Sequence, residues 1–293
     1  MIAVMGASGN VGGKVADGLL RADQEVRVFG RSAARLEALG RWGAEVVVGD
    51  ATDPAAVRAL CKGADAALVV LPDDLTDPRY VANRSQMSRV VAEALREQQV
   101  RHVVLASSIG ADQGTGPIAG LHELEGLLFG LEDSNVLALR SGWYMENLLA
   151  SLPLIRAQGI SGSVIKADRP LPMIATVDVA REAAGRLVRR DFTGHAVKVL
   201  LGPEDLTMAE ATRALGAALG LPDLPYVEFP PEGVTAALRQ AGMSEEGAAV
   251  LVEAQLAINQ GLVTGGVERT PATATPTPLQ DFLHDALAGA ASR

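Results

Sequence analysis

Three glycines near the N-terminus constrain the fold of this chain more than any other feature. Gly6, Gly9 and Gly12 follow a short apolar run, Ile2–Met5, and they open a segment with helical spacing. In a strand–turn–helix unit of this kind, the first glycine makes the tight turn and the second lets the backbone approach a pyrophosphate. The third lets the helix pack closely on the strand. Amides at the helix start face the phosphates, assisted by the helix dipole. The pattern predicts a dinucleotide-binding turn.

Neighbouring residues of the turn supply further contacts. Ser8 and Asn10 can add side-chain donors, and Val11 lies at the helix start, where backbone amides are free. A glycine-rich turn without function is the alternative, because a lone glycine pattern is weak evidence. The position between a strand and a helix, with a second strand–helix unit following, favours the dinucleotide.

The residues after the second strand indicate which dinucleotide is bound. An NAD-specific site usually carries Asp or Glu here to bind the ribose hydroxyls, whereas this chain has Arg31 followed by Ser32. A carboxylate would repel a 2′-phosphate, but Arg31 can hold it with a forked guanidinium and Ser32 can add a hydroxyl. Arg35, one turn further on, is a weaker second contact. We expect NADP(H); the alternative is that Arg31 is a solvated arginine at a strand end.

Two later residues are further candidates for cofactor contacts. Asp50 follows the third strand, where its carboxylate can accept a hydrogen bond from the adenine amino group. It can equally cap or turn the chain before Pro54. Leu71 closes the fourth strand, which a Rossmann order of strands would place beside the cofactor ribose.

Apolar runs alternate with helical segments over the first 140 residues. The strand-like runs are Ile2–Met5, Glu25–Phe29, Ala44–Val48, Ala66–Leu71, His102–Ala106 and Val136–Leu139. The segments with helical spacing are Val11–Arg21, Ala33–Arg41, Pro54–Cys61, Tyr80–Gln98 and His122–Glu132. The alternation predicts an α/β fold with a Rossmann-type, doubly wound parallel sheet. The strands are almost wholly apolar, as expected where helices cover both faces.

After Arg140 the rhythm weakens. Gly159–Pro172 has the composition of a loop, and Ala196–Leu200 is one more strand candidate. Expected helices are Thr176–Arg190, Met208–Leu219, Gly233–Gln240, Glu245–Asn259 and Leu279–Ala288, with Thr270–Pro278 as an extended linker. We expect an NADP-binding domain over residues 1–150, sheet-completing segments around 174–201, and a smaller, mainly helical substrate lobe over 202–293.

The reactive end of such a sheet lies beyond the carboxyl ends of its strands. Ser107 and Ser108 follow the fifth strand, so we expect one of their hydroxyls to face the nicotinamide and polarise a substrate carbonyl. Both can also simply satisfy backbone amides in a turn. The Tyr-x-x-x-Lys pair of ordinary short-chain dehydrogenases is absent. His122 is the titratable candidate at that place, with a solvated helix residue as the alternative.

Composition restricts the function classes. A net charge of −9 over 293 residues argues against nucleic-acid binding, and no apolar run approaches the roughly 18 residues of a membrane span. Cys61, the single cysteine, rules out an internal disulfide and favours a reducing, cytoplasmic location. No cysteine pair or H-E-x-x-H motif indicates a metal site. The expected partner is a small-molecule acceptor, and the sequence is compatible with a homodimer.

Taken together, the motifs resemble those of a known family. The glycine turn, Arg31, Asp50, the serines after the fifth strand and the helix led by His122 are similar to the NmrA-like branch of the atypical short-chain dehydrogenases. The more specific segment is Leu139–Asn147, which reads Leu-Arg-Ser-Gly-Trp-Tyr-Met-Glu-Asn. It resembles the corresponding segment of NADPH:quinone oxidoreductases and triphenylmethane reductases.

The resemblance implies a substrate site in a cleft beside a small C-terminal lobe. It implies that Trp143, Tyr144 and Asn147 line this cleft with His122, although the two aromatic residues also suit a purely structural role. The family often carries Glu four residues after the histidine, whereas this chain has Gly126 there and Glu125 before it. We expect an NADPH-dependent reductase of a small planar acceptor such as a quinone. The alternative is an NADP(H)-sensing regulator without turnover, whereas a sugar-nucleotide epimerase would need the absent tyrosine.

Overall fold

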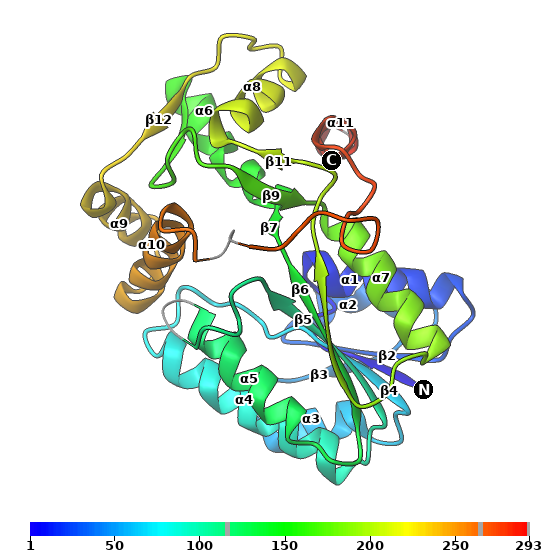
Figure 1. The fold of residues 1–293 in the computed structure, drawn as a ribbon. Helices are drawn as coiled ribbons and strands as arrows, with labels where there is room; N and C mark the ends of the chain where they lie inside the picture. The colour runs from blue at the N-terminus through cyan, green and yellow to red at the C-terminus, as the bar shows by residue number, and fades with distance from the viewer. Residues whose placement is uncertain (115–117, 263–265, 292–293) are drawn as a thin grey trace. The chain divides into compact units, whose positions relative to one another are not determined.

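A seven-stranded sheet forms the centre of the N-terminal unit in the computed structural model, which describes residues 1–114, 118–262 and 266–291 (Figure 1). Its order is β10-β6-β5-β4-β1-β2-β3. The strands are β1 (Ile2–Val4), β2 (Val26–Gly30), β3 (Glu45–Val48), β4 (Ala66–Val69), β5 (His102–Ser108), β6 (Asn135–Ser141) and β10 (His195–Leu200). β1 pairs in parallel with both β2 and β4, so the chain order reverses between β1 and β4. This is the doubly wound Rossmann arrangement that the alternation predicts.

Helices cover both faces of this sheet (Figure 1). One face carries α3 (Pro54–Cys61), α4 (Tyr80–Glu97) and α5 (Ala119–Phe129); the other carries α1 (Asn10–Arg21), α2 (Ala33–Arg41) and α7 (Thr176–Arg189). Alternate strand residues such as Val103 and Leu105 are fully buried in the core beneath α3–α5, where they meet Leu95 and Leu124. Burial of each such side chain contributes about 1.5–3 kcal/mol. The apolar strands are therefore explained by cover on both sides.

The contacts divide the chain into two compact units. The first comprises Met1–Asp74, Arg79–Arg140 and Val179–Lys198, and the second comprises Leu75–Pro78, Ser141–Asp178 and Val199–Arg293. The second unit contains two small sheets, β11-β9-β7 and β12-β8. Their strands are β7 (Trp143–Tyr144), β8 (Ser161–Ser163), β9 (Leu171–Ile174), β11 (Asp205–Leu206) and β12 (Tyr226–Glu228).

Helices supply most of the regular secondary structure of the second unit. They are the 3-10 helix η2 (Met145–Ser151) and the α-helices α6 (Leu152–Gln158), α8 (Met208–Ala218), α9 (Pro231–Gln240), α10 (Glu245–Asn259) and α11 (Leu279–Ala291). Their core joins Leu171 and Met173 of β9 to Leu215 of α8 and Leu283 of α11. α8 begins with a full capping box, in which the Thr207 hydroxyl and the Glu210 carboxylate each accept from the other's backbone amide.

Two expectations for the later part of the chain are wrong. Gly159–Pro172 is not all loop, because it contains β8 and the start of β9. β8 pairs with β12, more than sixty residues further on, and such pairing leaves no local periodicity. Thr270–Pro278 is not an extended linker: it turns at Thr270 and pairs with Leu201, and the Thr277 hydroxyl donates to Asp178.

The helix expected over His122–Glu132 begins at Ala119 and ends at Phe129, before Gly130. His122 therefore lies in its first turn but not at its first residue.

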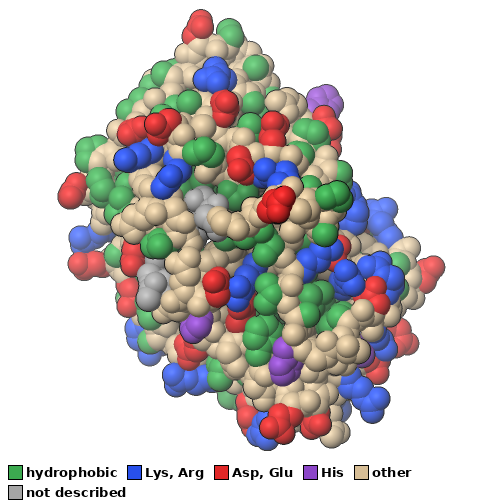
Figure 2. Space-filling model, viewed as in Figure 1, with side chains coloured by type: hydrophobic (Ala, Val, Ile, Leu, Met, Phe, Trp, Pro, Cys, Tyr) green, Lys and Arg blue, Asp and Glu red, His purple; other side chains and the backbone are tan. Residues whose placement is uncertain are grey.

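On the face shown in Figure 2, basic and acidic side chains are intermingled. Among the described residues, no helix combines the length and the apolarity that crossing a bilayer requires.

Candidate active site

The glycine turn lies at the point where the order of the strands reverses. Gly6 follows β1 with a φ of +70°, and a Cβ at this position would lie 2.7 Å from the carbonyl oxygen of Val70, which follows β4. A Cβ at Gly12 would lie 2.3 Å from the carbonyl oxygen of Gly6. Both positions exclude any other residue without movement of the backbone. The turn is thus held tightly between β1, β4 and α1.

The start of α1 is open to an anion. Ser8, Gly9 and Asn10 are exposed, and within the described chain no side chain caps this helix and no acidic residue lies in its first turn. By contrast, the start of α3 is capped by the Asp53 carboxylate, which accepts from the Ala55 amide. An uncapped helix start with bare backbone beside it is a ready anion site. These features fit a dinucleotide pyrophosphate.

Val11 and Leu71 are buried, unlike Ser8, Gly9 and Asn10 of the glycine turn. The Val11 side chain is buried, so its contribution to a cofactor is its position at the helix start. Leu71 is also buried, and it packs in the core beneath α3–α5. It lies just beyond β4, which ends at Val69 and not at Leu71 as expected.

Arg31 already has a carboxylate partner. It follows β2, and its Nη1 donates to Oδ2 of Asp74 from the segment after β4. Asp50 follows β3 and forms an Asx turn, since its Oδ1 accepts from the amide of Thr52 at 2.8 Å and from its hydroxyl at 2.6 Å. These hydrogen bonds lower the pKa of the Asp50 carboxyl, the hydroxyl contributing most. Asp50 thus has the turn role that its sequence position left open.

Ser107 and Ser108 are the last two residues of β5, whereas the sequence pattern predicts that they lie after the strand. The Ser107 hydroxyl is buried and donates to Oε1 of Glu125 at 2.5 Å. The Ser108 hydroxyl is half-buried and lies 3.0 Å from the Ile109 carbonyl oxygen. The two neighbouring serines therefore differ: the Ser107 hydroxyl donates to an ionisable side chain, and the Ser108 hydroxyl donates to a backbone carbonyl.

Glu125 is the centre of a network that connects α5 to β5 and β6. Besides Ser107, it accepts two hydrogen bonds from the Arg140 guanidinium, at 3.1 Å from Nε and 2.6 Å from Nη2. Nη1 of Arg140 lies 3.1 Å from Oδ1 of Asp112 in the loop after β5. The hydrogen bond and charge of Glu125 raise the pKa of Arg140 further above its usual value. Arg140 is thus a permanently charged link between two acidic residues.

His122 lies on the same helix as Glu125, one turn earlier. Its Nδ1 is 2.8 Å from the carbonyl oxygen of Ala111. Because a carbonyl only accepts, Nδ1 carries the proton, and Nε2 is left to accept a proton or, when charged, to donate one. The ring lies against Gly114, where a Cβ would come within 3.1 Å of Nε2. The loop after β5 thus sets both the tautomer and the position of the ring.

The three residues implied to contact substrate belong to the second unit. Trp143 and Tyr144 form β7, which pairs in parallel with β9, and Trp143 packs against the core of that unit. Asn147 is exposed on η2. In the same segment, the Glu146 carboxylate accepts from the amide and hydroxyl of Thr176, at the start of α7. Trp143 therefore has a packing role whatever else it contacts.

Sequence reasoning missed the partners of these groups. No sequence pattern indicates Asp74, Asp112 or Glu146, and Glu125 stands out only as a departure from the family pattern. Arg140 offered the one usable signal, because an arginine at the end of an apolar strand requires an acidic partner. The identity of that partner depends on how α5 docks on the sheet.

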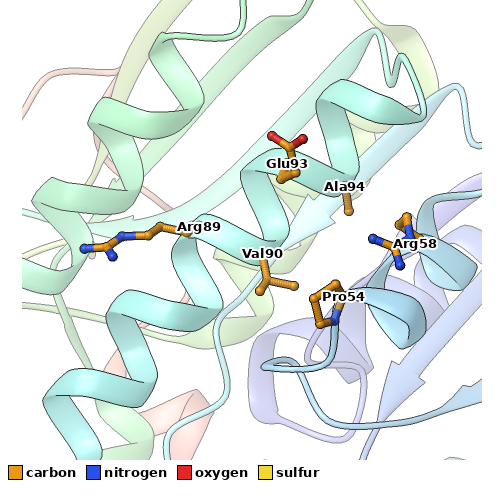
Figure 3. Close-up of a pocket in the computed structure, with 6 residues that line it drawn as sticks. All are labelled: Pro54, Arg58, Arg89, Val90, Glu93 and Ala94. Atoms are coloured by element: carbon orange, nitrogen blue, oxygen red, sulfur yellow. The ribbon is translucent and has the colours of Figure 1, made fainter.

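Two surface cavities contain none of the predicted site residues. One, of about 190 Å³, lies between α3 and α4 and is lined by Pro54, Arg58, Arg89, Val90, Glu93 and Ala94 (Figure 3). The other, of about 280 Å³, lies in the second unit beside Lys166 and Asn259. Neither brings together groups with an evident catalytic arrangement.

Comparison with known proteins shows which proteins this chain is similar to. Residues 6–128 match the model of the NAD(P)H-binding family. Quinone oxidoreductase 2 of Escherichia coli (strain K12) is 28% identical over a match of 279 residues. The match covers 89% of this chain and 89% of that protein. The chain resembles the NmrA-like family and is similar to its NAD(P)H-binding members. The predicted binding of a nicotinamide dinucleotide is confirmed at the level of NAD(P)H.

Solved structures share the fold of this chain. The E. coli NADPH-dependent quinone oxidoreductase complexed with NADPH has a TM-score of 0.81 and 23% identity, covering 98% of this chain and all of that one. Triphenylmethane reductase from Citrobacter, complexed with NADP(H), has a TM-score of 0.78 and 21% identity over 98% of this chain and 100% of that chain. A mutant NmrA has a TM-score of 0.66 and 16% identity over 98% and 91%.

Proposed function

We propose that the chain is an NADPH-dependent reductase that transfers hydride to a small planar acceptor such as a quinone. The observation that carries the proposal is the open start of α1 beside Arg31, at the carboxyl ends of β1 and β2. The resemblance to quinone oxidoreductase 2 supports the reaction class. When bound, the nicotinamide supplies the hydride.

Each part of the N-terminal unit has a task in this proposal. The amides of Gly9, Asn10 and Val11, with the Ser8 hydroxyl, bind the pyrophosphate, and Arg31 binds the 2′-phosphate. The Asp50 turn and the backbone near Leu71 border the adenosine and ribose.

The reactive end is assigned to His122 and Ser108. Nε2 of His122 holds or delivers a proton as the reduced acceptor gains charge, while the Ala111 carbonyl keeps Nδ1 protonated. Ser108 is the better candidate to meet the nicotinamide, because the Ser107 hydroxyl is bound to Glu125. Trp143, Tyr144 and Asn147 contact the acceptor.

The first test is oxidation of NADPH by the purified protein with a panel of quinones and quinone-like dyes, run in parallel with NADH. Turnover that is faster with NADPH supports both the reductase and the role of Arg31. Tight binding of NADPH without oxidation by any acceptor would replace the reductase with the NADP(H)-sensing regulator. The absence of a Tyr-x-x-x-Lys pair in the sequence suits that second function equally well.

His122→Ala tests the reactive end. We expect kcat to fall roughly tenfold or more, because a positioned proton donor is lost, while the dissociation constant of NADPH stays within about twofold. His284→Ala is the matched control, since His284 is exposed on α11. Steady-state kinetics and a binding titration measure the two quantities. Equal kcat in both variants would reduce His122 to a structural residue of the loop after β5.

A further inference from the structure

The guanidinium proposed to bind the 2′-phosphate is already occupied by a carboxylate of the chain itself. Nη1 of Arg31 and Oδ2 of Asp74 form an ion pair, although the two residues lie on different connections of the sheet. The Arg31 side chain is 50% exposed and that of Asp74 is 33% exposed. An anion arriving from solvent can therefore reach the same guanidinium.

Asp74 is held close to Arg31 by its neighbour. Oδ1 of Asp73 accepts from the hydroxyl of Tyr80 at 2.7 Å and pairs with Arg84, both on α4. The Arg84 side chain is 13% exposed and that of Asp73 is 64% exposed, so the pair joins a buried group of the helix to the surface of the loop. Asp74 follows a residue that is tied to the helix, and its freedom to swing away from Arg31 is reduced.

A third carboxylate borders the pair. The pKa of Asp50 is lowered mainly by Thr52, and beyond that Arg31 lowers it while Asp74 raises it. Asp50, Arg31 and Asp74 thus lie within electrostatic range at the ends of β2, β3 and β4. Two carboxylates and one guanidinium carry a net negative charge. A 2′-phosphate, with close to two negative charges, meets an Arg31 guanidinium that is already paired until Arg31 releases Asp74.

We propose that Asp74 is a specificity-determining residue, which takes the place of the 2′-phosphate on Arg31 and lowers the advantage of NADP(H) over NAD(H). The phosphorylated cofactor must displace the carboxylate or share the guanidinium with it, and both alternatives cost binding free energy. The unphosphorylated cofactor leaves the pair intact. The inference rests on the proposed function only in placing the 2′-phosphate at Arg31.

Two fragments that differ only in the 2′-phosphate test the inference without turnover. Adenosine 2′,5′-bisphosphate and AMP are titrated calorimetrically into the full-length wild type, Asp74→Asn and Arg31→Ala. We expect Asp74→Asn to bind the bisphosphate about threefold to tenfold more tightly, since a half-exposed ion pair shifts equilibria by up to about fivefold and relief of like-charge repulsion adds to this. AMP affinity stays within about twofold.

Glu37→Gln is the matched control, because it removes one negative charge from the exposed surface of α2, where Glu37 pairs with Arg41 and not with Arg31. It should change the bisphosphate affinity less than twofold, and thermal unfolding confirms that each variant is folded. Unchanged or weaker bisphosphate binding by Asp74→Asn, or an equal gain in Glu37→Gln, overturns the role of Asp74 while leaving the reductase proposal standing. Equal effects of Arg31→Ala on both fragments overturn the cofactor assignment itself.

Discussion

Two arginine–carboxylate pairs in the N-terminal unit have the same chemistry and different surroundings. Arg31 and Asp74 meet at the cofactor end, with side chains 50% and 33% exposed. Arg140 and Glu125 meet near His122, with side chains 17% and 4% exposed. Arg31 reaches its partner through one nitrogen, whereas Arg140 binds Glu125 through two and Asp112 through a third.

The difference in burial gives the two arginines different roles: Arg31 can bind a ligand, whereas Arg140 stabilises the fold. A solvated pair contributes little to stability, because water and salt compete for both charges. Its arginine can therefore exchange one anion for another. A buried carboxylate that loses its arginine remains desolvated and unpaired, which is strongly unfavourable. Arg140 cannot leave Glu125 without disturbing the packing of α5. This suits a residue that fixes the position of α5, and therefore of His122, relative to the loop after β5.

The largest expected effect is on stability, and it compares the two arginines directly. Arg140→Met leaves the Glu125 carboxylate buried without its cation, so we expect the free energy of unfolding to fall by about 3–5 kcal/mol. Arg31→Met should lower it by less than about 1 kcal/mol. Urea denaturation followed by circular dichroism measures both.

A double variant controls for the loss of packing by the arginine stem. Combining Arg140→Met with Glu125→Gln removes both charges, and we expect it to recover part of the stability lost in Arg140→Met alone. Equal losses of stability in Arg140→Met and Arg31→Met would show that the two pairs do not differ as their burial indicates.

The same contrast shows how far sequence reasoning reaches. The glycine turn, the β1 to β6 alternation and Arg31 at the end of β2 follow from residues close together in the chain, where periodicity and turn chemistry act. Asp74 lies 43 positions from Arg31, and Glu125 lies 15 positions from Arg140. Which carboxylate meets which arginine depends on strand order and helix docking. β8 was missed for the same reason, since its partner β12 is distant.

A smaller effect separates the two serines at the end of β5. Ser107→Ala removes one hydrogen bond to the buried Glu125 carboxylate, so we expect a loss of about 1.5 kcal/mol of unfolding free energy. Ser108→Ala should cost less than about 0.5 kcal/mol, because its hydroxyl is half-buried and donates to the carbonyl of the next residue. Thermal unfolding of both variants measures the difference. A larger loss of unfolding free energy in Ser108→Ala than in Ser107→Ala would show that the Ser107 hydroxyl does not stabilise the network of Glu125 and Arg140.

The smallest effect concerns Asp50. Its carboxylate accepts hydrogen bonds from Thr52, two residues further on, whereas the Asp74 carboxylate pairs with the distant Arg31. The Thr52 hydroxyl and amide lower the pKa of Asp50 in the folded chain. A lowered folded-state pKa stabilises the fold above the ordinary carboxyl pKa, and this contribution is lost as the pH falls through the folded value. Thr52→Val keeps the amide and removes the hydroxyl. We therefore expect the Asp50 pKa to move back toward its ordinary value, measured by carboxyl carbon NMR.

The pH dependence of unfolding provides the second readout for Asp50. In Thr52→Val, the loss of stability on acidification that comes from Asp50 should be smaller than in the wild type and should be complete at a slightly higher pH, with the two curves converging once Asp50 is protonated in both. In Arg31→Met, the Asp50 pKa should rise less than in Thr52→Val, because Arg31 ranks below Thr52 among the groups that lower it. A larger rise in Arg31→Met would make Asp50 a direct partner of Arg31. The cofactor end would then hold its arginine between two carboxylates, and Asp74 alone could not set its availability to a phosphate.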